Sequence, residues 1–261
     1  MYLTKLDLDM QKRKTANWLQ NPYNIHKRLW MAFPAEKHKH NDPPPFLYRL
    51  ELQSQTRILV QSKNKPSWQL AFKDFDILLN LPKEEEDVKE IKTDNFLESG
   101  SVFRFSLIAN PTKKVKDYRS LFQKELKDYP ETWTHANHTK YLEGKRILED
   151  LKKSVSKEQR EKLKSKKIGI YNKEEQIQWL SNRGKEGGFE LIEVNHIPSV
   201  IQHEDAFERI KKDKETKSIQ VYTVHFTGIF RVTNQDAFKH TYTYGIGSAK
   251  AFGCGMLMIA R

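Results

Sequence analysis

The order of strand-like and helix-like segments most constrains the fold of this chain of 261 residues. Residues 1–9 alternate between apolar and polar side chains, as in a strand with one buried face. A helix is predicted after Asn21, two strands at 46–52 and 57–62, a second helix from Asp74 through Leu79, and a strand between 88 and 96. This β-α-β-β-α-β order is typical of a ferredoxin-like domain.

A second series with the same order follows. Strands are predicted at 102–109, 189–194, 219–232 and 256–260, and helices at 174–182 and 237–244. The sequence therefore predicts an α+β fold of two tandem ferredoxin-like (RRM-like) domains with antiparallel sheets, at residues 1–97 and 98–261. An insertion at about 113–172 interrupts the second domain.

The insertion is the most basic part of the chain. Residues 145–167 contain ten Lys or Arg against four Asp or Glu, which is half of the formal net charge of +12. Leu148, Leu151 and Val155 have helical spacing and predict an amphipathic helix there. Because the surplus has one sign, a surface facing phosphate is favoured over a merely solvated helix face. Whether the segment contacts RNA or a protein is left open.

The charge and composition limit the class of partner. A pI near 9.5 points to a polyanion, and RNA or DNA is the default candidate. No membrane partner is expected, because the longest uncharged apolar run, 251–260, is shorter than the roughly 20 residues of a membrane span. Asp7 and Asp9 interrupt any signal-peptide pattern, and the single cysteine, Cys254, excludes an internal disulfide. We expect a cytoplasmic protein.

The predicted helix after Asn21 contains the strongest candidates for catalysis. Asn21 suits the N-cap, and Pro22 suits the first helical position. A helical repeat places a buried stripe at 25, 29, 32 and 33, with His26 at its edge, three residues from Tyr23 and beside Lys27. A histidine beside a phenol and an ammonium can cleave RNA without a metal. The alternative is a half-buried structural histidine.

A glycine-rich segment at 245–255 is the second candidate site. Such segments let backbone N–H groups approach phosphate, although a plain turn before the last strand is the alternative. It lacks the spacing of a Walker loop or a dinucleotide fingerprint.

The predicted RNA-binding residues of the whole chain are Arg28, Lys113, Lys114, Lys145, Arg146, Gly247, Ser248 and Lys250. Arg104 and Arg231 are expected to be RNA contacts or structural ion-pair partners, and the pairs His38/His40 and His135/His138 to be loop residues rather than metal ligands.

Several segments, in the same order along the chain, resemble the CasE family, the CRISPR repeat-processing endoribonucleases of type I-E Cascade. The resemblance lies in Asn21-Pro22-Tyr23 with His26 and Arg28-Leu29-Trp30, then Phe33-Pro34, the strand at 46–51, residues 105–113, Trp179-Leu180 with Gly188-Phe189, and the glycine-rich end. It covers both ends and most of the chain. The segment from about 117 to 173 matches poorly.

The resemblance implies tandem ferredoxin-like domains and cleavage of precursor CRISPR RNA at the base of the repeat hairpin, after which the enzyme stays bound as a Cascade subunit. It implies that His26 and Tyr23 are catalytic, with His26 as general acid or, in the reversed geometry, general base. Position 31 is Met where some members have an assisting lysine, so that role is either unfilled or taken by Lys27 or Lys37. No metal or other cofactor is expected. The alternatives are a non-catalytic subunit that binds a hairpin and, less favoured because no helix-turn-helix is visible, a DNA-binding regulator.

Overall fold

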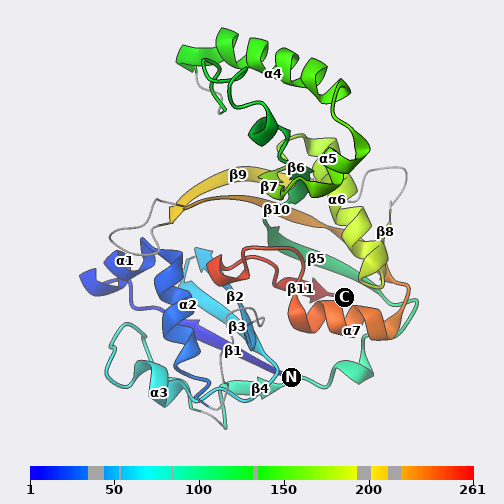
Figure 1. The fold of residues 1–261 in the computed structure, drawn as a ribbon. Helices are drawn as coiled ribbons and strands as arrows, with labels where there is room; N and C mark the ends of the chain where they lie inside the picture. The colour runs from blue at the N-terminus through cyan, green and yellow to red at the C-terminus, as the bar shows by residue number, and fades with distance from the viewer. Residues whose placement is uncertain (35–43, 53, 84, 132–134, 193–200, 211–218) are drawn as a thin grey trace. The chain divides into compact units, whose positions relative to one another are not determined.

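The chain forms two compact units in the computed structural model. The first comprises Met1–Pro111 and Ile170–Arg261, and the second comprises Thr112–Gly169. The structure describes residues 1–34, 44–52, 54–83, 85–131, 135–192, 201–210 and 219–261, drawn as a coloured ribbon in Figure 1. None of the helices in these ranges has both the length and the apolar character needed to cross a membrane.

The amino-terminal part of the first unit contains a four-stranded antiparallel sheet (Figure 1). Its elements are β1 (Tyr2–Asp7), α1 (Arg13–Leu19), α2 (Pro22–Trp30), β2 (Phe46–Leu52), β3 (Thr56–Ser62), α3 (Trp68–Phe72), β4 (Val88–Glu90) and the 3-10 helix η1 (Thr93–Asn95). The strand order is β2-β3-β1-β4. Both helical connections therefore join parallel strands that are not neighbours, which is the ferredoxin-like arrangement.

The carboxyl-terminal part of the first unit repeats this strand order as β11-β5-β10-β8. Its elements are β5 (Val102–Ala109), α6 (Lys173–Glu186), β8 (Phe189–Leu191), β9 (Ile201–Ile210), β10 (Ile219–Val232), α7 (Gln235–Tyr244), the 3-10 helix η4 (Lys250–Phe252) and β11 (Leu257–Ala260). The sequence prediction did not include β9, which pairs with the first part of β10. The predicted α+β fold with two tandem ferredoxin-like halves and antiparallel sheets is confirmed.

The predicted helix from Asp74 through Leu79 is wrong. The helix of this region is α3, which begins earlier and ends at Phe72. The following apolar residues instead extend alongside the end of β1: Leu79 N donates to Asp7 O, and Asp9 N donates to Ile77 O, both at 2.9 Å. These tertiary hydrogen bonds satisfy the backbone without helical pairing, and they bury Ile77 in the core.

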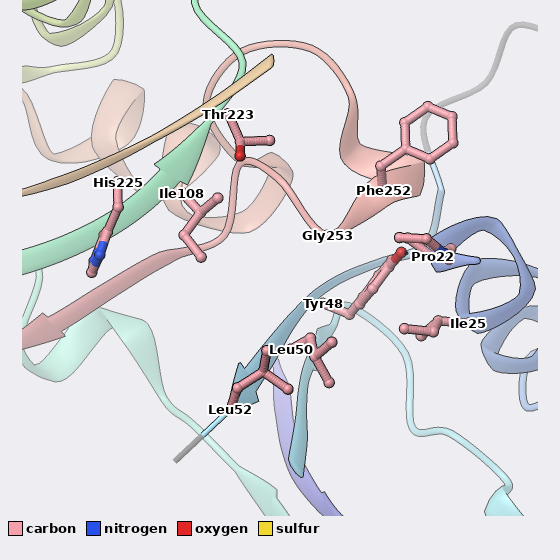
Figure 2. A pocket seen from close by; sticks show the side chains of 10 residues that line it. All are labelled: Pro22, Ile25, Tyr48, Leu50, Leu52, Ile108, Thr223, His225, Phe252 and Gly253. Carbon is pink, nitrogen blue, oxygen red and sulfur yellow. Dashed lines mark hydrogen bonds between the residues drawn. The ribbon is translucent and has the colours of Figure 1, made fainter. Parts of the chain in front are cut away.

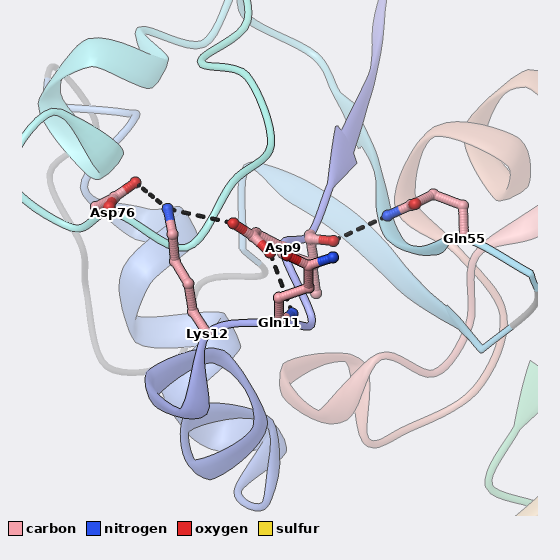
Figure 3. A network of polar contacts seen from close by, with 6 residues as sticks. Asp9, Gln11, Lys12, Gln55 and Asp76 are labelled. Carbon is pink, nitrogen blue, oxygen red and sulfur yellow. Dashed lines mark hydrogen bonds and ion pairs between the residues drawn. The ribbon is translucent and has the colours of Figure 1, made fainter.

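A polar cluster fixes the turn between β1 and α1 (Figure 3). Lys12 Nζ lies 2.6 Å from Asp76 Oδ1 and 3.4 Å from Asp9 Oδ2, and the hydrogen bond that Lys12 donates to Asp76 is the main cause of its raised pKa. Gln55 Nε2 donates to Leu8 O at 2.8 Å. The segment at 74–79 is thus held to β1 by side chains as well as by backbone.

Each half of the first unit has its own apolar core. Leu6 and Ile58 of the first sheet pack in one cluster with Ile25 of α2. In the other, the ring of Phe230 lies 5.1 Å from that of Phe238 on α7. Each fully buried side chain of this size contributes about 1.5–3 kcal/mol. The two helices α2 and α7 are therefore held to their sheets mainly by buried hydrocarbon.

Polar contacts join the two halves within the first unit. Gln61 Nε2 on β3 donates to Tyr242 O on α7 at 2.6 Å, in a buried setting. Arg49 Nη1 on β2 donates to Ser106 Oγ on β5 at 2.8 Å, and burial lowers the pKa of Arg49. These bonds connect residues that are at least 57 positions apart in sequence. They fix one sheet against the other.

The second unit contains a two-stranded antiparallel ribbon with helices between its strands. Its elements are β6 (Thr112–Lys116), the 3-10 helices η2 (Tyr118–Leu121) and η3 (His135–Asn137), α4 (His138–Lys153), α5 (Lys157–Lys162) and β7 (Ser165–Gly169). The helix predicted from Leu148 and Leu151 is part of α4, and Val155 is buried just after its end. The predicted domain boundary at 97 and 98 stays a prediction.

Candidate active site

The helix α2 begins as the sequence predicts. Asn21 Oδ1 accepts a hydrogen bond from Tyr23 N at 3.0 Å, and Pro22 occupies the first turn. The whole predicted stripe is buried: Ile25, Leu29, Ala32 and Phe33. This stripe fixes the rotation of the helix, because turning it would expose hydrocarbon. It therefore fixes which way the remaining side chains of α2 point.

His26 lies deeper than the predicted edge of that stripe, with 8% of its surface exposed. The ring of Phe46 on β2 covers it at 5.5 Å between centroids, and the ring of Tyr23 stacks on it at 6.0 Å with 29° between the planes. Lys27 is exposed, and its Nζ lies 5.4 Å from the centre of the Tyr23 ring. The structure thus brings together the three predicted catalytic residues, Tyr23, His26 and Lys27.

The indole of Trp30 completes the surroundings of His26. Trp30 Nε1 donates to His26 Nε2 at 2.9 Å, one helical turn along α2. The two rings meet edge to face, at 87°. The sequence analysis gave Trp30 no role in the site.

A tyrosine that the sequence analysis did not single out connects α2 with the glycine-rich segment. Tyr48, on β2, lies beside Pro22 (Figure 2), and its hydroxyl is 3.0 Å from Pro22 O and 3.0 Å from Ala251 O. The Phe252 ring also lies 6.1 Å from the Tyr23 ring. The glycine-rich segment therefore packs against the same end of α2 that carries Tyr23.

The glycine-rich segment needs its glycines. Gly245 has φ +77°, and a Cβ there would lie 2.7 Å from Gly255 O and 2.9 Å from Leu47. Gly247 has φ +83° and lies against the Trp179 ring. Between them and η4, Ser248 Oγ donates to Asn110 Oδ1 at 2.9 Å. Burial lowers the pKa of Lys250, the first residue of η4.

An apolar cavity of about 220 Å³ lies next to this arrangement (Figure 2). It is lined by Pro22, Ile25, Tyr48, Leu50, Leu52, Ile108, Thr223, His225, Phe252 and Gly253. His26 is not among the lining residues. The cavity therefore shares Tyr48 and Phe252 with the site, but the residues of α2 that line it are Pro22 and Ile25 rather than Tyr23 and His26.

The remaining predicted RNA-binding residues fall into two groups. Lys113 and Lys114 on β6, and Lys145 and Arg146 on α4, are all exposed cations of the second unit. Arg28 is engaged within the first unit: its guanidinium lies 3.9 Å from the centre of the Phe75 ring, and Nη1 donates to Ala71 O at 3.2 Å. Burial lowers the pKa of Arg28. Its predicted contact with RNA stays a prediction.

The other candidates are settled only in part. Arg231 forms an ion pair with Glu190 at 3.0 Å, as expected of a structural residue. Met31, which stands where an assisting lysine was considered, is exposed, and Arg28 Nη1 donates a hydrogen bond to its sulfur at 3.4 Å. Lys37, His38 and His40 lie outside the described residues.

The chain is similar to known proteins along its whole length. The family model described as CRISPR associated protein matches residues 1–261. The CRISPR-associated endoribonuclease Cse3 of Thermus thermophilus is 26% identical, with all of both chains covered. The CRISPR system Cascade subunit CasE of Escherichia coli K12 is 24% identical, covering 100% of this chain and 99% of that protein. The solved structure of Thermus thermophilus Cse3 bound to an RNA representing a pre-cleavage complex aligns at a TM-score of 0.69 with 25% identity, covering 100% and 98%.

Proposed function

The chain belongs to the CRISPR-associated protein family, and from that premise we propose that it is an endoribonuclease that cuts precursor CRISPR RNA at the repeat hairpin. We further propose that it stays on the hairpin of the mature RNA as a subunit of a Cascade complex. The names of the two similar proteins, an endoribonuclease and a Cascade subunit, support both parts. The observation that carries the proposal is the grouping of Tyr23, His26 and Lys27 beside the glycine-rich segment.

The proposed chemistry is an internal transfer of the phosphoryl group. The 2′-OH next to the cut attacks its own phosphorus, the bond to the 5′-oxygen of the next nucleotide breaks, and a 2′,3′-cyclic phosphate forms. His26 gives a proton to the departing oxygen, or takes the proton of the 2′-OH if the RNA binds in the reversed orientation. Either role is typically worth ~10²–10⁴-fold in rate.

Tyr23 and Lys27 have supporting roles in this proposal. Tyr23 orients the 2′-OH through its hydroxyl, which can both donate and accept a hydrogen bond. Lys27 is the cation that the site offers to the extra negative charge of the pentavalent phosphate. No metal enters the proposed chemistry.

The glycine-rich segment and the second unit are proposed to hold the RNA backbone. Gly247, Ser248 and Lys250 lie on a segment that contains several left-handed residues, a backbone conformation that phosphate-binding loops also use. In the second unit, Lys114 of β6 lies directly opposite Lys167 of β7. Like charges in that register destabilise a ribbon, and a bound phosphate relieves their repulsion.

The alternative is a subunit that binds a hairpin without cutting it. The same fold and charge would serve it, but it would not require the Tyr23 and His26 pair. One assay separates the two functions: the protein is incubated with its neighbouring repeat RNA in EDTA, and the product ends are mapped. We expect one cut with a 2′,3′-cyclic phosphate, and none on RNA with a 2′-deoxy nucleotide 5′ of the cut. Binding without cleavage would support the alternative, and activity that needs added Mg²⁺ would refute the metal-free chemistry.

A further inference from the structure

The hydrogen bond between Trp30 and His26 determines which form of the imidazole the free protein holds. An indole N–H can only donate, so His26 Nε2 must present its lone pair at the observed 2.9 Å. The imidazole is then neutral, with its proton on Nδ1. The imidazolium carries N–H on both nitrogens and would place two donors face to face.

The packing around the two rings keeps this pair together. Trp30 and His26 are one turn apart on α2, where side chains at i and i+4 meet. The Phe46 ring lies 5.5 Å from the imidazole and 5.8 Å from the indole. The same ring therefore supports both partners.

This arrangement conflicts with either proton-transfer role at Nε2. A general acid must first gain a proton on that nitrogen, and a general base must offer a lone pair to the 2′-OH. In the structure the indole occupies that lone pair. His26 is therefore held in a resting state.

We propose that Trp30 is a positioning residue that keeps His26 as the neutral Nδ1–H tautomer, and that the indole must leave Nε2 before His26 transfers a proton in RNA cleavage. The second part rests on the proposed function, whereas the first concerns the free protein alone. The indole keeps its own proton throughout, so that the proton on Nε2 comes from solvent or from the 2′-OH.

The test of the first part is an NMR titration of the free protein with ¹⁵N-labelled histidine and tryptophan. The wild type should show Nε2 as the unprotonated nitrogen of neutral His26, with a scalar coupling across the bond to Trp30 Nε1. Trp30→Phe keeps a ring against Phe46 and removes only the donor. Since a hydrogen bond to the neutral form disfavours the charged form, this variant should protonate His26 at a higher pH. A net hydrogen bond corresponds to roughly a two- to tenfold change in that equilibrium.

The matched control is Trp18→Phe, which removes an indole of α1 that meets the Phe75 ring edge to face instead. Among the described residues, the titratable groups of α2 and of the elements in contact with it include Tyr23 and Lys27 on α2, Tyr48 on β2 and Lys250 in η4, and these are the same in all three proteins. A shift in the titration of His26 that occurs only in Trp30→Phe is therefore due to the loss of the Trp30 indole. The proposal is overturned if wild-type His26 carries its proton on Nε2, a result that needs no variant, or if folded Trp30→Phe titrates like the wild type.

The second part is tested with single-turnover cleavage over a range of pH. We expect the limb assigned to His26 to move to higher pH in Trp30→Phe, with an unchanged dissociation constant for RNA. If the NMR titration of His26 shifts in Trp30→Phe but this limb of the pH–rate profile does not, the release step is overturned. If His26→Ala cleaves like the wild type, the proposed catalytic role fails, and the tautomer result in the free protein still stands or falls on its own.

Discussion

At the scale of the residue, the proposed chemistry depends most directly on His26. Periodicity was enough to place it beside Tyr23, because helical geometry is local and the buried stripe fixes the rotation of α2. Its depth was not predictable, since Phe46 lies on a strand 20 residues away. The contact of Tyr48 with Ala251 could not be predicted either, because the two residues are 203 positions apart in sequence.

His26→Ala should abolish cleavage while the affinity for the hairpin stays close to that of the wild type. Losing a general acid or base removes stabilisation of the transition state only, by about 10²–10⁴-fold in rate. Single-turnover rates and dissociation constants on one RNA measure this. His240→Ala, on α7 beside Tyr244, is the control. A variant that unfolds would instead favour a structural histidine.

The affinity for RNA should fall with rising pH earlier in the wild type than in Lys250→Arg. Burial lowers the pKa of Lys250, so its ammonium loses a proton at a lower pH than an exposed lysine does. Phosphate binding needs the charged form, which the guanidinium keeps throughout. Dissociation constants measured between pH 7 and 10 test this. If the affinity depends on pH in the same way in the two proteins, Lys250 does not contact a phosphate.

At the scale of the element, the end of α2 and the turn η4 are coupled through one hydroxyl, that of Tyr48. The sequence predicted α2, the sheets and the glycine-rich segment, since each has a local pattern. It misplaced the helix near Asp74 because the hydrogen bonds of Ile77 and Leu79 go to residues around β1. Local patterns identify elements, whereas pairings between distant segments decide how the elements meet.

Tyr48→Phe should lower the cleavage rate more than the affinity for RNA. The variant keeps the buried ring and removes the bond that fixes η4 to α2, at a cost of roughly 0.5–1.5 kcal/mol in the free energy of unfolding. We expect a fall of about tenfold in the single-turnover rate, because misplaced catalytic groups lose orientation. Urea unfolding and cleavage measure the two effects, and equal losses of affinity and rate would assign Tyr48 to RNA binding.

At the scale of the whole molecule, the charge is distributed unevenly. Residues 112–169 contain 17 Lys or Arg and 9 Asp or Glu, and so carry eight of the twelve net positive charges. Some of these cations are already paired, such as Lys152 with Glu149 and Lys153 with Asp150. Composition located the charge but could not separate paired from unpaired lysines, because that depends on how α4 orients each side chain.

Changing Lys114 and Lys167 together to Gln should flatten the dependence of RNA affinity on salt. Each lost phosphate contact reduces the slope of log K against log salt by roughly 0.7–0.9. Changing Lys152 and Lys153 to Gln removes the same charge from paired positions and should alter the slope less. RNA binding is measured for both double variants and the wild type from 50 to 300 mM salt. If all three proteins show the same slope of log K against log salt, the second unit does not contact RNA.

The point where the chain leaves the first unit has a consequence for how such a protein changes over time. Pro111 O accepts a hydrogen bond from Ile170 N at 3.0 Å, so that the exit and the return are adjacent on one framework. Mutations that lengthen, shorten or replace residues 112–169 leave the strand pairing of both sheets unchanged. The segment can therefore change in length or sequence while the framework of the two sheets stays the same. The same junction offers engineers a place to graft a reporter or a foreign domain.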